Sequence, residues 1–370
     1  DYTDKIIIPG MTDLHLHAPQ YSFRSLGMDL ELLEWLEANT FPEESKFKDL
    51  QYAGRAYEIF VKELKKSATT RACIFATIHK EATLLLMDKL ETSGLVTMVG
   101  KVNMDRNSPE ILKERTEESV ENTVEWLEEV EKRKYKNTYP ILTPRFTPSC
   151  TDELMEKLKE IQIKYNLPMQ SHLSENPNEI KWVKELCPWS EVYGDAYKKF
   201  GLFGNECKSI MAHCVYSDEK EMKLMKERGI FVAHCPESNT NLSSGIAPVR
   251  KFLENGLEIG LGSDIAGGTN LNLFYAMTQG IQVSKLYWRL VDSSCKPLTV
   301  EEVFYLATKG GGKFFGKVGS FEKDYEFDAV VLDDERLEYP QELSVKSRLE
   351  RMIYLADDRE IKAKFVRGKE

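Results

Sequence analysis

Features typical of membrane proteins and of nucleic-acid-binding proteins are scarce in this sequence. No apolar run approaches the ~18 residues that a transmembrane helix needs, and no secretory signal is recognisable. Basic residues are in the minority: 50 Lys and Arg stand against 60 Asp and Glu, which gives a formal net charge of −10. This charge disfavours nucleic-acid backbones and anionic membrane surfaces as partners, but it is compatible with a single base or nucleoside as a ligand.

Cysteine motifs are missing as well. The seven cysteines are spread along the chain, none forms a CxxC pair, and their number is odd. A disulfide framework is therefore disfavoured, and reduced thiols in a cytoplasmic protein are the better interpretation. The lack of CxxC also excludes the metal site of the nucleic-acid-editing deaminases, which requires a PCxxC motif.

Short apolar runs, by contrast, recur along the chain with helical segments between them. The eight runs cover residues 6–8 leading into 13–17, then 72–78, 95–102, 141–142, 169–172, 209–213, 230–234 and 258–262. Apolar periodicity and capping residues predict helices over 116–134, 152–165 and 217–228. Eight strands that alternate with helices predict an α/β fold of the (β/α)8 TIM-barrel type.

Only six histidines occur, and most of them fall at predicted strand ends. In a parallel barrel the strand ends share one mouth, where residues far apart in the sequence meet. His15 and His17 alternate with Leu16, so both imidazoles point to the same side of the first strand. An isolated HxH is more often structural. With His172 and Asp264 added, the set matches the imidazole and carboxylate ligands of a catalytic zinc-type metal.

Groups for proton transfer and substrate binding accompany this set. Glu175 follows His172 by three residues and is placed to move protons for a water whose pKa a metal lowers towards ~7. Arg145 offers donors to a substrate carbonyl or ring nitrogen, or else forms a structural ion pair. Phe146 is an aromatic wall or ordinary core. Gln20 reads the edge of a planar heterocycle or is a solvated loop residue.

Other residues near the strand ends receive structural interpretations. A single metal does not need His79 or His234, so we expect supporting or structural roles for both. Cys214 and Cys235 each follow a strand-end histidine, and alternation predicts that they point away and pack. Asp13 either orients a histidine or caps a turn.

Several motifs resemble those of the metal-dependent amidohydrolase superfamily: PGMTDLHLHAPQ, SHLSEN, MAHC, AHCPESN and GLGSDIAGG. A second group, HAPQYSF, LLEWLEANTFPEE, FATIH, LTPRFTPSC and LSSG, is similar more narrowly to the guanine deaminases. The resemblance runs from about Pro9 to about Ala329.

This resemblance implies hydrolysis of guanine to xanthine and ammonia in purine catabolism or salvage, by a cytoplasmic homodimer. It implies one zinc ion per chain, or iron, with His15, His17, His172 and Asp264 as ligands. It implies Glu175, Asp264 and His213 as catalytic residues. Guanine would be bound by Gln20, Arg145, Phe146, His17, His172, Glu175, His213 and Asp264.

The resemblance also implies a small β-sandwich built from both chain ends. The strongest boundary lies near 310–312, and short strands are predicted over 329–332 and 361–366. We therefore expect residues 1–8 to end an N-terminal sandwich segment, 9–320 to form the barrel and 321–370 to supply the C-terminal sandwich strands. Because the sequence opens almost at the first barrel strand, we expect the N-terminal sandwich strands, and the natural start, to be missing from it.

Two alternatives stay open. The metal motif does not separate guanine deaminases from amidohydrolases that deaminate or dechlorinate another purine, a pyrimidine or a triazine. A non-enzymatic barrel scaffold is the other alternative, but such proteins usually lose a ligand or the proton shuttle, and here the full set is present.

Overall fold

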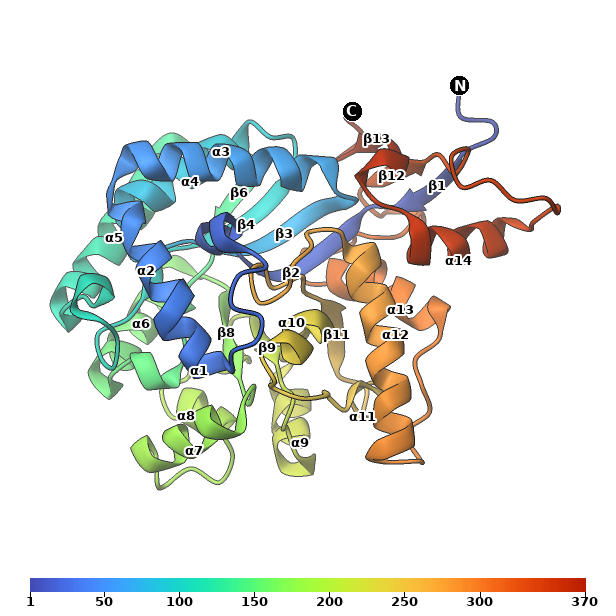
Figure 1. Cartoon of the computed structure of the whole chain (residues 1–370). Helices are drawn as coiled ribbons and strands as arrows, with labels where there is room; N and C mark the ends of the chain where they lie inside the picture. Colours follow the sequence, from blue (N-terminus) through green and yellow to red (C-terminus); the bar gives the residue numbers. More distant parts are fainter.

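A ring of eight parallel strands forms the centre of the molecule (Figure 1). The computed structural model describes all 370 residues. In chain order the ring strands are β2 (Met11–His17), β3 (Thr69–Phe75), β4 (Val96–Gly100), β6 (Thr138–Pro140), β8 (Met169–Leu173), β9 (Ser209–His213), β10 (Phe231–His234) and β11 (Glu258–Leu261). Their hydrogen-bonded order is β6-β4-β3-β2-β11-β10-β9-β8. A parallel bridge between Leu142 and Met169 closes the ring, so the predicted (β/α)8 TIM barrel is confirmed.

The fourth barrel strand is interrupted. Its first piece, β6, pairs with β4, whereas its second piece, β7 (Thr143–Pro144), pairs with the short strand β5 (Val102–Asn103). Pro140 and Pro144 have no N–H to donate, so neither can continue a regular ladder. The sequence predicted a strand only at 141–142, which is the junction between the two pieces.

Helices surround the ring (Figure 1). They are α3 (Leu50–Lys66), α4 (Lys80–Glu91), α5 (Thr116–Arg133), α6 (Asp152–Tyr165), α7 (Pro177–Leu186), α8 (Gly194–Lys198), α9 (Glu219–Arg228), α10 (Pro236–Asn241), α11 (Val249–Glu254), α12 (Leu273–Leu290) and α13 (Val300–Tyr305). Caps set the ends of α9: the Asp218 side chain accepts from Glu221 N–H, and Gly229 ends the helix at φ 65°. No helix combines the length and the hydropathy that a bilayer crossing requires.

Most barrel strands are buried on both faces, which explains why most of them read as short apolar runs. Ile210 and Ala212 of β9 belong to a small apolar cluster with residues of other ring strands, and this cluster fills the inside of the barrel. Met211, between them, belongs to a cluster of 77 buried residues that lies between the ring and the helices.

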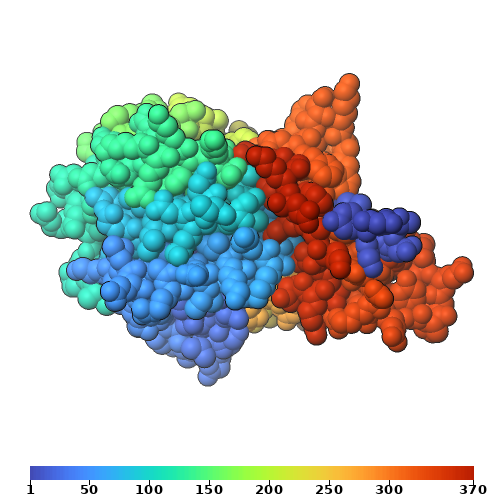
Figure 2. All heavy atoms as spheres, turned by 90° about the horizontal axis from the view of Figure 1, so that it is seen from above, coloured from blue at the N-terminus to red at the C-terminus, as the bar shows by residue number.

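The two chain ends meet in a separate antiparallel sheet with the order β1-β12-β13. Its strands are β1 (Ile6–Pro9), β12 (Ala329–Leu332) and β13 (Ile361–Phe365). Figure 2 shows the N-terminal residues against the C-terminal segment on one side of the barrel. The division at residues 8 and 320 stays a prediction. Helix α14 (Val345–Leu355), between β12 and β13, was not predicted from the sequence.

Gly10 marks the change from the small sheet to the barrel. A Cβ at this position would lie 2.4 Å from Thr70 Oγ1 and 2.9 Å from Asp328 Cβ. Only glycine therefore lets the chain cross here between the two sheets.

A buried ion pair joins the small sheet to the barrel. Arg71 of β3 is 1% exposed, and its guanidinium lies 2.7 Å from Asp328 and 2.9 Å from Glu326. We expect Asp328→Ala to lower the free energy of unfolding by about 3–5 kcal/mol, because the buried guanidinium keeps only the partly exposed Glu326 as a partner. Denaturant unfolding measures this loss. As a control, Glu335→Ala removes an exposed carboxylate 3.8 Å from Lys5 and is expected to change nothing measurable. Equal effects of the two variants would contradict the account.

Candidate active site

Strand ends bring the predicted ligand side chains together at one mouth of the barrel. His15 and His17 lie on β2, His172 lies on β8, and Asp264 follows β11. The Nε2 atoms of His15 and His17 are 3.1 Å and 3.5 Å from Asp264 Oδ1. His172 Nε2 is 3.3 Å from His17 Nε2. The four side chains thus converge as barrel topology requires, although they come from three separate strands.

The ring nitrogens of this cluster fit a metal ion. The Nδ1 of the fully buried His15 has no hydrogen-bond partner, and its Nε2 lies 3.1 Å from Asp264 Oδ1 without a regular hydrogen bond. His172 Nδ1–H donates to the Arg145 carbonyl at 2.6 Å, which leaves its Nε2 lone pair facing the cluster. The ligand atoms of His15, His17 and His172 lie within 4.8 Å of one another. A divalent cation would satisfy these buried nitrogens.

The charge states of the cluster suit metal binding too. Burial lowers the pKa of the His15, His17 and His172 imidazoles, so they are neutral near pH 7 and offer lone pairs. Burial raises the pKa of the Asp264 carboxyl, but its interactions with His15, His213 and His17 together outweigh this effect and hold the pKa well below its usual range. Three neutral imidazoles and one carboxylate are a common ligand set for zinc-type ions.

His213 lies between two carboxylates at the end of β9. Its Nε2 is 3.4 Å from Glu175 Oε2 and 3.7 Å from Asp264 Oδ2, and its Nδ1 is 2.8 Å from Asn239 Oδ1. The backbone of His213 and of Asp264 has positive φ, 73° and 47°. Residues in such sparsely populated conformations cluster at active sites, where the surrounding fold holds them in place.

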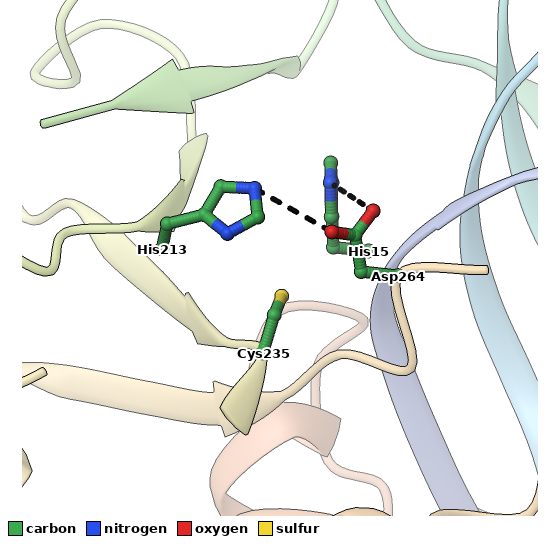
Figure 3. Close-up of side chains that lie close together, drawn as sticks. All are labelled: His15, His213, Cys235 and Asp264. Carbon is green, nitrogen blue, oxygen red and sulfur yellow. Dashed lines mark ion pairs between the residues drawn. The ribbon is translucent and has the colours of Figure 1, made fainter. Parts of the chain in front are cut away.

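Cys235 is the residue that the sequence placed wrongly. Figure 3 shows it beside His213, His15 and Asp264, and its Sγ belongs to a group whose ligand atoms all lie within 4.8 Å of one another. Side chains do alternate along β10, but it is Cys235 that points into the barrel and His234 that points outward. His234 faces helix α12, because a Cβ built at Gly280 would lie 3.9 Å from its Nε2.

The structure also shows where the other residues near the strand ends lie. Cys214 does point away, with Sγ 4.0 Å from the Met225 sulfur. His79 and His234 are both outside the group of ring nitrogens described above. Asp13 Oδ1 accepts from the backbone N–H groups of His15 at 3.2 Å and Ser263 at 3.0 Å, so it fixes backbone rather than an imidazole ring.

Glu175 is buried beside the cluster and is suited to hold a proton. Its Oε1 accepts from the Ser244 hydroxyl at 3.3 Å. Burial, followed by the charge of Asp264, raises the pKa of Glu175 well above its ordinary value. The start of α7 fixes its backbone, because Glu175 N–H donates to Glu179 Oε2 at 3.0 Å and Glu179 completes a capping box with Asn176.

A cavity opens next to this cluster. All eight side chains predicted to bind substrate line it: His17, Gln20, Arg145, Phe146, His172, Glu175, His213 and Asp264. Sequence reasoning missed the apolar lining residues Leu32, Trp35, Leu36 and Leu242. Three of them, Leu32, Trp35 and Leu36, belong to the motif LLEWLE, whose apolar residues could have indicated a pocket wall.

Gln20 and Arg145 share a partner that was also missed, the buried Glu44. Gln20 Nε2 donates to Glu44 Oε1 at 2.9 Å, and Arg145 Nη1 donates to Glu44 Oε2 at 2.6 Å. Ala266 N–H donates to Gln20 Oε1 at 3.3 Å. Arg145 therefore forms a buried ion pair and also lines the cavity, so the two alternatives for this residue do not exclude each other.

Comparison with known proteins agrees with this geometry. The model of the Amidohydrolase family matches residues 6–370. The chain therefore belongs to the amidohydrolase family, whose members are metal-dependent. Within that family its close relatives are guanine deaminases. The guanine deaminase of Dictyostelium discoideum is 42% identical over 375 residues, which cover 100% of this chain and 83% of the relative.

Solved structures give the same result. The crystal structure of guanine deaminase from C. acetobutylicum with bound guanine in the active site is 49% identical, with a TM-score of 0.97. The match covers 100% of this chain and 88% of that one. The E. coli guanine deaminase is 34% identical, with a TM-score of 0.90, and the match covers 100% and 85%. The predicted resemblance is confirmed.

Proposed function

We propose that this chain hydrolyses guanine to xanthine and ammonia in purine catabolism or salvage. The observation that carries the proposal is that all eight side chains assigned to guanine binding line one small cavity at the mouth of the barrel. Whole-chain similarity to guanine deaminases supports the same activity.

The residues that would hold a metal are His15, His17, His172 and Asp264. One zinc ion per chain, or iron in its place, fits their neutral imidazoles and single carboxylate. When bound, such an ion supplies Lewis acidity that lowers the pKa of a water molecule towards ~7.

Protons move through the two buried carboxyl groups. Asp264 accepts a proton from the attacking water, and the protonated Glu175 delivers a proton to ring nitrogen N3 of guanine, which makes C2 electrophilic. The water oxygen adds to C2 and forms a tetrahedral intermediate, and His213 stabilises the charge that develops on oxygen. The proton held by Asp264 then reaches the amino group, directly or through Glu175, and Glu175 regains a proton from the hydroxyl group on C2, which becomes the carbonyl of xanthine. The C2–N bond breaks, and ammonia and xanthine leave.

Arg145 gives the site its preference for guanine. Its guanidinium only donates, so it suits the acceptors O6 and N7 of guanine and meets the 6-amino group of adenine donor to donor. An unpaired buried donor costs about 1–3 kcal/mol. We therefore expect Arg145→Ala to reduce the ratio of binding affinities for guanine over adenine by about 5- to 150-fold. Inhibition or direct-binding constants for both bases test this, and an unchanged ratio would mean that Arg145 is structural.

A substrate panel tests the function as a whole. Purified, metal-analysed protein is assayed by ultraviolet absorbance against guanine, adenine, cytosine and 8-oxoguanine, and released ammonia is quantified. We expect fast conversion of guanine with about one metal ion per chain. Turnover of another ring with guanine untouched would favour a different amidohydrolase. No turnover together with no bound metal would favour the non-enzymatic scaffold.

We also propose that the enzyme is a cytoplasmic homodimer. Seven free cysteines support a reducing compartment. Exposed apolar side chains on α12 and α14, among them Leu286, Leu290 and Tyr354, support a second copy of the chain as a partner. Light scattering at assay concentration measures the mass of the particle, and a monomer would contradict the dimer.

A further inference from the structure

The long connection between β2 and α3 covers the mouth of the barrel (Figure 1). It consists of short helical pieces: η1 (Ala18–Phe23), α1 (Leu32–Trp35), η2 (Leu36–Thr40), α2 (Phe41–Glu44) and η3 (Ser45–Lys48). Its apolar residues Leu32, Trp35 and Leu36 line the cavity. The connection therefore forms one wall of the pocket and also delivers Glu44 behind it.

Glu44 is 2% exposed and lies outside the lining of the cavity. Each of its carboxylate oxygens is bound by a different cavity residue, Oε1 by Gln20 and Oε2 by Arg145. The Arg145 guanidinium carbon also lies 5.5 Å from the centre of the Phe41 ring, on the same short helix. Helix α2 thus holds Arg145 through an acid and an aromatic ring.

We infer that Glu44 is a positioning residue that sets the purine edge the site accepts, an inference that rests on the proposed function. A carboxamide presents a donor on one side and an acceptor on the other, and rotation exchanges them. Glu44 only accepts, so the Gln20 NH2 group faces Glu44 and its oxygen faces Ala266 N–H. This orientation fixes which atoms Gln20 presents to the base.

Glu44 also supplies the counter-charge for Arg145. The Arg145 side chain is 4% exposed, and Glu44, at 3%, is its ion-pair partner. A guanidinium buried without a carboxylate is strongly disfavoured and turns towards solvent or another acid. With Glu44 in place, Arg145 stays in the pocket as a donor while the guanidinium–carboxylate pair is neutral overall. That arrangement suits an uncharged base with acceptor atoms on the facing edge.

The test is Glu44→Gln, which keeps the shape of the side chain. Gln20 and Arg145 bind different oxygens of Glu44, and a glutamine replaces one of these oxygens with an NH2 group that meets a donor, so the two contacts cannot both be kept in this arrangement. We expect kcat/KM for guanine to fall about 10- to 100-fold, with KM rising more than kcat falls, because these contacts bind substrate and transition state alike. Metal content is expected to stay at the wild-type level.

Glu43→Gln is the matched control. Glu43 is the neighbouring buried acid of the same helix, but its partners are Lys46, at 2.6 Å, and Tyr52. We expect this variant to have wild-type kinetics on guanine. A merely structural role for Glu44 would give the two variants the same kinetics and would overturn the inference.

A double-mutant cycle separates positioning from independent effects. If Glu44 acts through Arg145, then Glu44→Gln lowers kcat/KM for guanine clearly less in an Arg145→Ala background than in the wild type. If the double variant instead loses the product of the two single fold-losses in kcat/KM, while the wild type still turns over guanine, the inference is overturned. A wild type inactive on guanine would overturn the proposed function and this role together. If Glu44→Gln does not fold, Glu44→Asp, which keeps the charge but not the reach, serves in the same cycle.

Discussion

Replacing Glu175 by glutamine is expected to lower kcat for guanine about 10²–10⁴-fold, the usual contribution of general acid–base transfer. The geometry explains the size of the effect. Glu175 lines the cavity, lies 3.4 Å from His213 and has a pKa well above its ordinary value, chiefly because it is buried. It can therefore carry a proton near pH 7, whereas an amide of the same shape cannot release one.

The measurement combines steady-state kinetics with metal analysis. Because Glu175 is not among the predicted ligands, Glu175→Gln should keep its metal. Glu185→Gln, on the exposed side of helix α7, which begins just after Glu175, is the matched control and should keep wild-type kcat. Near-normal turnover by Glu175→Gln would refute the role of Glu175 as the proton donor.

The second large effect is expected at the metal ligands. His17→Gln should lose the metal and lower guanine turnover by about 10³-fold or more, because a bound cation supplies several kcal/mol of transition-state stabilisation. His17 Nε2 lies 3.5 Å from Asp264 Oδ1 and 3.3 Å from His172 Nε2, at the centre of the cluster.

His79→Gln is the matched control for His17→Gln. His79 also lies at a strand end, after β3, but it neither lines the cavity nor belongs to the group of close ring nitrogens. We expect this variant to keep its metal and its activity. Metal analysis and kinetics on both variants test the assignment. A His17→Gln protein with full metal content, or a His79→Gln protein without metal, would contradict it.

The barrel and the convergence of its ligands could be predicted because both depend on local signals. Most strands are short apolar runs buried on two faces, and each ligand stands at or just after the end of a strand. Parallel topology then brings His15, His172 and Asp264 to the same mouth, although some 250 residues separate the first from the last. No long-range contact has to be known in advance for this argument.

Two kinds of feature could not be predicted in this way: which of two neighbouring strand residues points inward, and contacts between residues far apart in the sequence. The four-residue strand β10 is apolar on both faces, so its sequence does not show that Cys235 rather than His234 turns inward. Glu44 belongs to a run of short helical pieces without a clear period. Its two partners lie 24 and 101 residues away in the sequence. Its role follows only from the folded connection.

Helix α14 was missed for a related reason. Its sequence, VKSRLERMIYL, is polar over most of its surface, and only Met352 and Ile353 are buried. The apolar stripe that marks an amphipathic helix is therefore narrow, and the surrounding residues read as connections between strands. The structure shows that this helix precedes β13 and lies beside the small sheet (Figure 1).

Metal titration tests the central claim most directly. Protein stripped of metal by a chelator receives zinc in steps, and guanine loss, xanthine and ammonia are measured at each step. The account predicts no turnover without metal, a rise that breaks at about one ion per chain, and equal amounts of xanthine and ammonia. Guanine turnover that survives complete removal of the metal, or a fully metal-loaded protein that leaves guanine untouched, would contradict it.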